Sequence, residues 1–282
     1  MMSGSEPRGR LILVGTPIGN LGDLTPRAIE TLAQADLVCC EDTRRTGRLL
    51  EHAGIRAKGF RVTNEHTEAA VSVEVVERIA NGQSVAVVSD AGMPGVSDPG
   101  ERLVNAVVEA GGIVEVVPGP SAALAGLVLS ALPTGRFVFE GFLPRKGQAR
   151  HDRLDAVASE PRTTVLFEAP HRLEKTLGDL VAVCGNDRRV SIAREITKLH
   201  EQVWRGTLGE ALSRCEQVAP RGEYVVVVGG APQPAEVDDD TILAELKRAR
   251  EAGSSNRDAV GDVAEMLKVA KRRVYDLATS KT

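Results

Sequence analysis

The sequence has 282 residues, of which 42% are hydrophobic and 26% are charged, as is ordinary for a globular protein in water. This length is enough for two compact domains and a short additional segment. The formal net charge of −4 argues against a general nucleic-acid-binding protein, since such proteins usually carry excess positive charge. The sequence has no run of about 18 apolar residues, so a membrane protein is not expected.

The chain begins with a polar segment, residues 1–10, that lacks the apolar stretch of a signal peptide. We expect it to be a disordered leader and the protein to be cytoplasmic. The sequence has no Cys-x-x-Cys pair, and reduced, buried thiols fit a cytoplasmic protein better than a zinc site does. No metal is therefore expected at the four cysteines, Cys39, Cys40, Cys184 and Cys215.

Short runs rich in valine, isoleucine and leucine predict strands. Most of them are continuously apolar, which is typical of strands buried on both faces of a parallel sheet. Helical segments follow several of these runs, so the alternation predicts an α/β architecture. The predicted strands are Leu11–Val14, Val85–Ser89, Ile113–Val117, Arg136–Glu140, Thr163–Phe167 and Tyr224–Val228.

Prolines and glycines mark the expected helix ends. Proline is favoured at the first helical position, after a capping residue, and glycine just beyond the last turn. Expected helix starts are Thr25-Pro26, Asp98-Pro99, Pro120 and Pro170, and expected stops are Gly111-Gly112 and Gly185.

A break near Gly119–Pro120 divides the pattern into a first α/β domain, residues 11–119, and a second, residues 120–230. A linker rich in proline and aspartate follows at 231–240. The remaining residues, 241–282, predict a small helical domain with the layout of a helix-turn-helix unit. Its expected helices are Leu243–Ala252, Arg257–Leu267 and Ala270–Thr279, the second capped by Ser254, Ser255 or Asn256.

Three loops rich in glycine and proline follow predicted strands. The first, 15–23, matches neither a dinucleotide fingerprint nor a P-loop, but its bare backbone lets a ligand approach closely. The second, 89–100, places Asp90 at the end of a buried strand, where open α/β sheets bind ligands. The third, 118–122, enters a helix whose free N–H groups attract a carboxylate. Each loop is also consistent with a simple turn.

Taken together and in this order, the loops resemble those of the tetrapyrrole-methylase superfamily, and within it the ribosomal RNA small-subunit methyltransferase I family. The short helical tail also matches that family. The set spans about residues 11–230 and is specific as a set, although any single loop would be weak. The matching segments are 15–23 (GTPIGNLGD), 41–44 (EDTR), 89–95 (SDAGMPG), 97–100 (SDPG), 118–122 (PGPSA), 141–145 (GFLPR), 167–172 (FEAPHR) and 194–198 (REITK).

The resemblance implies two α/β domains of tetrapyrrole-methylase type that bind S-adenosylmethionine in the cleft between them, in a homodimer that needs no metal. It also implies methyl transfer to the 2′-hydroxyl of a cytidine in the decoding region of 16S ribosomal RNA. The implied cofactor contacts are Pro17, Asp90, Met93, Ser121, Ala122, Phe167, Glu168, Ala169, Tyr224 and Val225.

A ribose hydroxyl is a poor nucleophile and should lose its proton as the new bond forms. Four side chains are candidates for the base, and the sequence does not choose among Glu195, Lys198, Glu168 and His171. Lys198 would need a pKa lowered by burial or by a neighbouring cation. Glu195 is also consistent with an ion pair to Arg194.

Substrate binding needs positive charge, and phosphate contacts are expected from three basic groups. Solvated faces, or contacts within a dimer or between domains, are the alternatives. With five Phe, two Tyr and one Trp, little aromatic surface is expected for stacking bases. Recognition should therefore depend on phosphates and on the shape of an assembled or nearly assembled ribosomal particle. The groups are Arg44, Arg45 and Arg48; Arg145, Lys146, Arg150 and Arg153, in a stretch expected to be flexible; and Lys271, Arg272 and Arg273, in a first helical turn.

Two other functions remain open. A methylase of a tetrapyrrole ring would use the same fold, but the basic stretch 145–153 and the helical tail favour RNA. A non-catalytic nucleic-acid-binding regulator would use 270–279 as a recognition helix and would need no cofactor.

Overall fold

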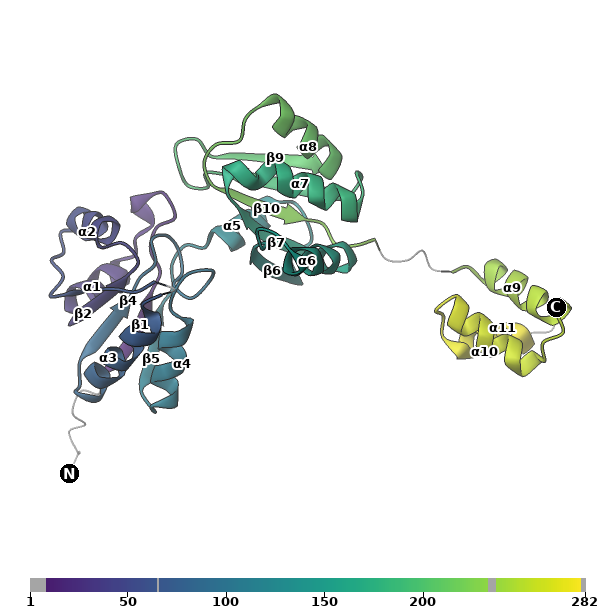
Figure 1. Cartoon of the computed structure of the whole chain (residues 1–282), viewed down its shortest axis with the longest axis horizontal. Helices are drawn as coiled ribbons and strands as arrows, with labels where there is room; N and C mark the ends of the chain where they lie inside the picture. Colours follow the sequence, from purple (N-terminus) through teal and green to yellow (C-terminus); the bar gives the residue numbers. More distant parts are fainter. Residues whose placement is uncertain (1–8, 65, 233–236, 280–282) are drawn as a thin grey trace. The chain divides into compact units, whose positions relative to one another are not determined.

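The computed structural model describes residues 9–64, 66–232 and 237–279. The chain divides into two compact units, Met1–Ala231 and Pro232–Thr282, and the first holds two five-stranded sheets (Figure 1). Residues 1–8 of the expected leader lie outside the described residues. The expectation of disorder is wrong for Gly9 and Arg10, because Gly9 is buried and Arg10 begins the first strand.

The first sheet is parallel, with strand order β3-β2-β4-β1-β5. Because β1 lies between β4 and β5, the loops after these three strands emerge side by side at one edge. Backbone bonds join them there: Thr16 N donates to Gly92 O at 2.8 Å, and Gly15 N donates to Val117 O at 2.9 Å. The strands are β1 (Arg10–Val14), β2 (Leu37–Cys40), β3 (Phe60–Val62), β4 (Ser84–Val87) and β5 (Ile113–Val117).

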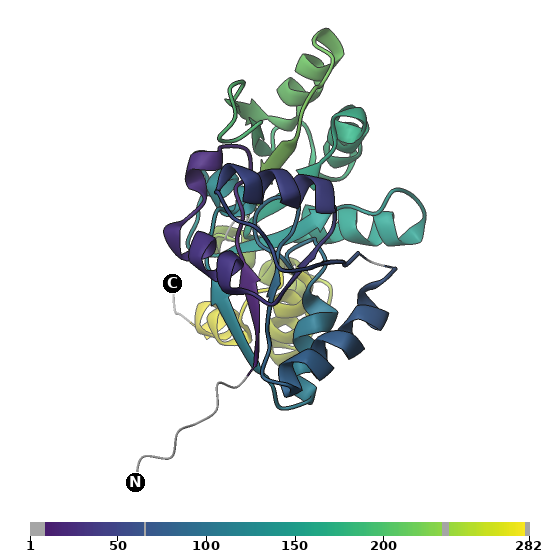
Figure 2. The ribbon, with the colours of Figure 1, turned by 90° about the vertical axis from the view of Figure 1, so that its left-hand side faces the viewer.

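Helices cover both faces of this sheet, which is why its central strands are apolar after their first residues, Arg10 in β1 and Ser84 in β4. Ile12 and Val14 belong to a core with α1 and α2, whereas Leu11 packs with α3 and α4 on the other face. Figure 2 shows the two helix pairs on opposite sides of the strands. The helices are α1 (Pro26–Gln34), α2 (Thr43–His52), α3 (Glu68–Ala80) and α4 (Glu101–Glu109), with a short 3-10 helix, η1 (Leu21–Asp23).

The predicted start of α4 is wrong. Asp98 does not cap this helix, which begins at Glu101 after Gly100. The Glu68 carboxylate takes the place of a local cap, accepting from the backbone N–H groups of Gly100 at 2.8 Å and Arg102 at 3.0 Å. A side chain from α3 therefore satisfies the donors at the start of α4, and Asp98 is not needed as a helix cap.

Three other predicted helix starts can be compared with the structure. Pro26 begins α1 after Thr25, whose hydroxyl accepts from Ala28 N at 3.1 Å, and Pro170 begins α7 (Pro170–Cys184), so both are confirmed. Pro120 does not begin a helix: α5 (Ala122–Leu129) starts two residues later, with Ser121 as its cap.

The second sheet is mixed, with order β6-β7-β10-β8-β9, and only β6 and β7 are parallel. The expectation of parallel strands is therefore wrong for β10 (Tyr224–Val228), which is buried at every residue but antiparallel to both neighbours. Helices on both faces make a central strand apolar whatever its direction. The other strands are β6 (Phe137–Phe142), β7 (Thr163–Glu168), β8 (Arg189–Arg194) and β9 (Gln202–Thr207).

Helix α5 follows β5 of the first sheet but packs on the second, with Leu127 beside Val225 and Val227. The opposite face carries α6 (Gln148–Ser159), α7 (Pro170–Cys184) and α8 (Leu208–Gln217). The two sheets thus fall on either side of position 119, within one compact unit. The domain limits 11–119 and 120–230 remain a prediction.

The second unit consists of α9 (Asp239–Glu251), α10 (Asn256–Met266) and α11 (Lys271–Thr279) around a core that includes Ile242, Val260 and Val274. The predicted helical tail is confirmed. Its first helix starts four residues earlier than expected because Asp238 accepts from Thr241 N at 2.7 Å. Residues 233–236 of the expected linker lie outside the described residues, and of the three candidate caps Ser255 caps α10.

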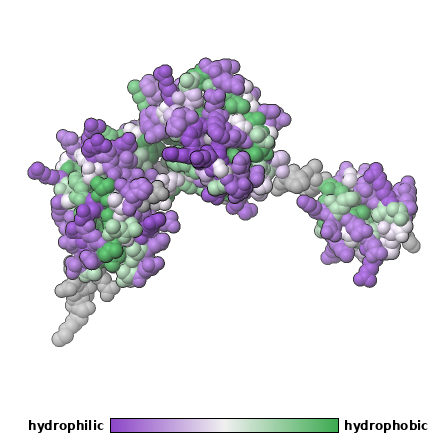
Figure 3. Space-filling view, viewed as in Figure 1, coloured by the Kyte–Doolittle hydropathy of each residue, from purple (hydrophilic) through white to green (hydrophobic). Residues whose placement is uncertain are grey.

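The four cysteines are free, and Cys39 and Cys40 are buried in the first sheet. Burial raises the pKa of the Cys39 thiol to about 11, so this group stays protonated. In the described part of the chain, no group of three or more His, Cys, Asp or Glu side chains is placed to hold a metal. Within the same ranges, no helix has the length and apolar character needed to cross a bilayer. Figure 3 shows a visible surface that is mostly hydrophilic, with hydrophobic side chains in small groups.

Candidate active site

A cavity of about 470 Å³, the cleft cavity, lies between the loops of the first sheet and the second sheet. A smaller one of about 320 Å³, the side cavity, adjoins it and shares Ile18, Ala91, Lys198 and Glu223 with it. The residues predicted to contact a cofactor divide between the two. Pro17 and Asp90 line the side cavity. The cleft cavity is lined by the other eight, Met93, Ser121, Ala122, Phe167, Glu168, Ala169, Tyr224 and Val225.

The first and third loops cross in close contact at Gly15 and Gly119, behind the cleft cavity. We call this contact the glycine crossing. A Cβ atom on Gly15 would lie 2.6 Å from the Cα of Gly119, and one on Gly119 would lie 2.8 Å from the Cα of Gly15. Such contacts are closer than carbon atoms tolerate, so both positions require glycine. The Met93 sulfur would also lie 2.7 Å from a Gly15 Cβ. The crossing therefore sets where Met93 and Ser121 stand.

The β8–β9 loop reaches from the second sheet to the first loop. Asn20 N donates to Thr197 Oγ1 at 3.2 Å, and the Lys198 chain lies where a side chain on Gly19 would stand. Glu195 and Thr197 have φ values of 50° and 67°, which are costly for residues with a side chain and are typical of functional sites. Local bonds hold this conformation, including Glu223 N to Glu195 Oε1 at 2.9 Å.

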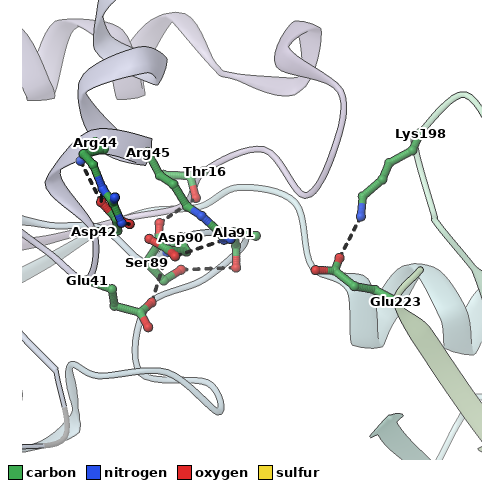
Figure 4. Close-up of polar contacts among 10 residues, drawn as sticks. All are labelled: Thr16, Glu41, Asp42, Arg44, Arg45, Ser89, Asp90, Ala91, Lys198 and Glu223. Atoms are coloured by element: carbon green, nitrogen blue, oxygen red, sulfur yellow. Dashed lines mark hydrogen bonds and ion pairs between the residues drawn. The ribbon is translucent and has the colours of Figure 1, made fainter. Parts of the chain in front are cut away.

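Asp90 carries an acceptor that no described residue satisfies. Its Oδ2 lies 3.0 Å from Nη1 of Arg45, while its Oδ1 is buried and has no hydrogen-bond partner among the described residues. Asp90 N donates to Glu41 Oε1 at 3.0 Å, which fixes the backbone (Figure 4). A buried carboxylate oxygen without a donor is costly, so Asp90 is suited to accept from a ligand.

Two further carboxylates stand beside Asp90. Burial, followed by the nearby charge of Glu41, raises the pKa of Asp98 to about 6, and burial also raises the pKa of Glu41. Asp98 lines the cleft cavity. Sequence reasoning missed both as site residues, although they belong to the quoted segments 41–44 and 97–100. It also missed Glu223, which lines both cavities and for which the sequence offered no signal.

We expect Asp98→Asn to change how stability depends on pH. The raised pKa means that the folded state of the native protein binds more protons than the unfolded state between about pH 4 and 6. The stability of the native protein therefore falls as the pH rises from about 4 to 6. The variant lacks this loss, so it should be about 1–2 kcal/mol more stable than the native protein at pH 7 and equally stable at pH 4, allowing for partial solvent screening. Denaturant unfolding at both pH values measures the difference; an equal difference at both would contradict the assignment.

The structure argues against two of the four candidate bases. Burial tends to lower the pKa of Lys198, but hydrogen bonds from its Nζ to Glu195 at 2.8 Å and Glu223 at 2.7 Å outweigh it and raise that pKa. The lowered pKa that a lysine base needs is therefore absent. The same bond from Lys198 lowers the pKa of Glu195, which makes it a weaker base. Glu195 pairs with Lys198, while Arg194 Nε donates to Arg221 O.

The other two candidates differ in exposure. Glu168 is buried, and its two oxygens accept from Thr176 Oγ1 at 2.6 Å and Ala169 N at 2.9 Å, with Arg172 3.1 Å away. His171 is exposed, lines the cleft cavity, and has no side-chain hydrogen bond among the described residues. Of the four, His171 is thus the one with a free titratable group facing this cavity.

Arg150 is not available for the predicted phosphate contact. It lies on α6, is 4% exposed, and donates to Asp179 Oδ2 at 2.8 Å and Thr176 Oγ1 at 3.0 Å. Arg153, on the same helix, lies 3.2 Å from Glu140. The stretch expected to be flexible is therefore helical from Gln148 onward. Only Arg145 and Lys146 of this group are exposed without an ion pair in the described structure.

The other basic groups are partly paired. Arg44 lies 2.8 Å from Asp42, Arg45 pairs with Asp90, and exposed Arg48 lines the side cavity. In the second unit, Arg273 lies 2.7 Å from Asp239, while Lys271 and Arg272 are exposed.

Comparisons with known proteins agree with this geometry. Residues 10–212 match the family described as Tetrapyrrole (Corrin/Porphyrin) Methylases. The chain is 44% identical over 273 residues to a ribosomal RNA small subunit methyltransferase I from Synechocystis sp., covering 96% of this chain and 97% of that protein. It is also 44% identical over 270 residues to the protein of that name from Mycobacterium tuberculosis, covering 95% and 94%.

Solved structures show the same fold. The methyltransferase CobJ matches with a TM-score of 0.61 and 23% identity, covering 79% of this chain and 95% of that one. Diphthine synthase matches with a TM-score of 0.59 and 18% identity, covering 78% and 90%. A uroporphyrin-III C-methyltransferase from Thermus thermophilus, solved with S-adenosylhomocysteine, matches with a TM-score of 0.54 and 21% identity, covering 79% and 97%.

Proposed function

The chain belongs to the ribosomal RNA small subunit methyltransferase I family of the tetrapyrrole methylases, and from this we propose that it transfers a methyl group from S-adenosylmethionine to small-subunit ribosomal RNA. The acceptor is the 2′-hydroxyl of a cytidine in the decoding region. One observation carries the proposal: two sheets contribute eight of the ten expected cofactor contacts to one cavity. The solved structures, all at or below 23% identity among those compared, support the fold and do not favour a tetrapyrrole substrate.

The cleft cavity fits the cofactor in size and chemistry. Its volume of about 470 Å³ lies within the range of small-molecule sites, about 300–1,000 Å³. Phe167, Val225 and Ala122 offer apolar contacts to the adenosine of the cofactor. Asp98 and Glu223 place carboxylates where they can attract its positively charged sulfonium. In the adjoining side cavity, the free Oδ1 of Asp90 accepts from an amine or a ribose hydroxyl. When bound, the cofactor supplies the electrophilic methyl group.

The protein's own task is to place the hydroxyl and remove its proton. Holding the acceptor oxygen in line with the methyl group supplies much of the rate. We assign the removal of this proton to His171, because its side chain lines the cleft cavity and has no hydrogen-bond partner among the described residues. Lys198, bound to Glu195 and Glu223, keeps its charge and positions the β8–β9 loop.

We also infer that the enzyme is a cytoplasmic homodimer that acts on an assembled or nearly assembled particle. Support for the dimer comes from α5, where Leu124 and Val128 are 52% and 69% exposed. Side chains four apart share one helix face, and an exposed apolar face of this kind suits a contact with a second copy.

A transfer assay tests the function. Small subunits from a strain lacking this enzyme should accept labelled methyl from S-adenosylmethionine, and mass mapping should place it on one cytidine ribose. His171→Gln should lower kcat at least a hundred-fold at unchanged cofactor affinity, because proton transfer contributes about 10²–10⁴. His151→Gln, in α6 and outside both cavities, is the matched control. No methyl on the particle, or methyl on a porphyrin instead, would reject the proposal.

A further inference from the structure

A third cavity, of about 600 Å³, lies against the second sheet on the side of α8. We call it the arginine cavity. Ala211, Arg214 and Cys215 come from one face of α8, and β8 and β9 supply Arg194 and Trp204. It is distinct from the candidate active site but shares Tyr224 with the cleft cavity. The loop before β10, residues 218–221, closes it.

The arginine cavity is positively charged, although the protein as a whole is acidic. Arg194, Arg214 and Arg221 line it, and no aspartate or glutamate does. Across residues 9–64, 66–232 and 237–279, none of the three forms an ion pair. Arg194 is held in place by its Nε bond to Arg221 O at 2.6 Å. No ion pair therefore neutralises these guanidinium groups, in contrast to Arg45, Arg150 and Arg153. Two carboxylates outside the lining act nearby, Glu195 on Arg194 and Glu174 on Cys215. With three arginines and no acidic residue in its lining, the cavity attracts an anion.

Aromatic surface stands beside this charge. Trp204, the single tryptophan of the sequence, lines the cavity with Tyr224. The indole is fixed because its ring packs on Gly206, where a Cβ would lie 2.6 Å from the ring. The Tyr224 hydroxyl accepts from Arg221 N at 3.0 Å. A fixed ring beside arginines offers a base a stacking surface and a phosphate its hydrogen bonds.

We propose that the arginine cavity binds an unpaired nucleotide of the RNA substrate, other than the one that is methylated. The base lies against Trp204, and Arg214 and Arg221 contact the phosphate. This inference rests on the proposed function for the identity of the RNA. Because the cavity shares Tyr224 with the cleft cavity, one RNA strand spans both sites. Trp204 in the arginine cavity also provides a surface for stacking a base, which few other residues of this chain can offer.

The tryptophan makes binding directly measurable. Titrating the full-length protein with a single-stranded RNA that carries the target sequence should quench Trp204 fluorescence. Arg214→Gln with Arg221→Gln should weaken binding at least ten-fold. The slope of log affinity against log salt should flatten by about 0.7 for each phosphate that the variant no longer neutralises. Arg56→Gln with Arg102→Gln removes the same charge from exposed positions outside all three cavities, and should change neither quantity appreciably.

Other readouts separate this inference from the proposed function. Calorimetry with S-adenosylmethionine should give the same affinity for the native protein and both double variants, which also shows that they are folded. In the transfer assay, the Arg214/Arg221 variant should raise KM for the particle at nearly unchanged kcat. Equal RNA affinity of the two double variants overturns the inference even if the native enzyme is active, as does equal quenching by inorganic phosphate alone. Absent methyl transfer by the native enzyme would reject the proposed function, while the RNA titrations would still decide the cavity.

Discussion

Gly119→Ala should lower cofactor affinity at least ten-fold and destabilise the first unit by about 1–3 kcal/mol. The added Cβ would lie 2.8 Å from both Cα and the carbonyl carbon of Gly15. These are backbone atoms that no rotamer change can move. The loops after β1 and β5 must therefore separate, and Met93 and Ser121 move with them. Calorimetry with S-adenosylmethionine and denaturant unfolding measure the two effects.

Gly135→Ala is the matched control for this substitution. Nothing lies within 4 Å of the Cβ that it would add, and its backbone is not in the left-handed region. We expect near-native cofactor affinity and stability. If Gly119→Ala behaved like this control, the close crossing behind the cleft cavity would not exist in solution.

Arg150→Ala should destabilise the protein by about 3 kcal/mol, because it removes a buried guanidinium, and hydrogen bonds to charged groups contribute about 1.5–3 kcal/mol each. Asp179 itself is 29% exposed and also pairs with Lys175, so its carboxylate keeps a cation. The guanidinium binds Asp179, Thr176 Oγ1 and the carbonyl of Pro144. Thr176 in turn donates to Glu168 Oε2 at 2.6 Å, so the disruption extends to a wall of the cleft cavity. The midpoint of thermal unfolding should fall by roughly 6–12 °C.

RNA affinity distinguishes this structural role from the phosphate contact that the sequence suggested. At a temperature where Arg150→Ala is folded, its RNA affinity should match that of the native protein. Arg153→Ala, on the same helix but with a side chain 54% exposed, should change stability by less than about 1 kcal/mol. A stable Arg150→Ala variant with weakened RNA binding would mean that Arg150 faces the substrate.

Six strands were predicted from sequence, including the edge strands β5 and β6, whose runs are largely apolar. Of the four that were missed, β3 and β9 are edge strands, β2 is an apolar run of only four residues, and β8 has an arginine at each end. Strand β3 is three residues long and exposed, and β9, with the sequence Gln-Val-Trp-Arg-Gly-Thr, is the edge strand beside β8. An edge strand buries one face at most, so its composition carries little of the apolar signal. The arginine cavity depends on β8 and β9, neither of which was predicted as a strand, so it could not be predicted from the sequence either.

By itself, the sequence determined that three glycine- and proline-rich loops follow strands and that Asp90 lies in the loop after one of these strands. It also determined that a helical tail follows the α/β part, because glycine, proline and apolar runs act through local backbone conformation. Only the tertiary structure decided that β10 is antiparallel, that Glu68 caps α4 in place of Asp98, and that Arg150 is buried. These features depend on contacts between residues distant in sequence. The sequence around Arg150 is the same whether its guanidinium binds an aspartate 29 positions away or a phosphate of the substrate, so only the tertiary structure distinguishes the two roles.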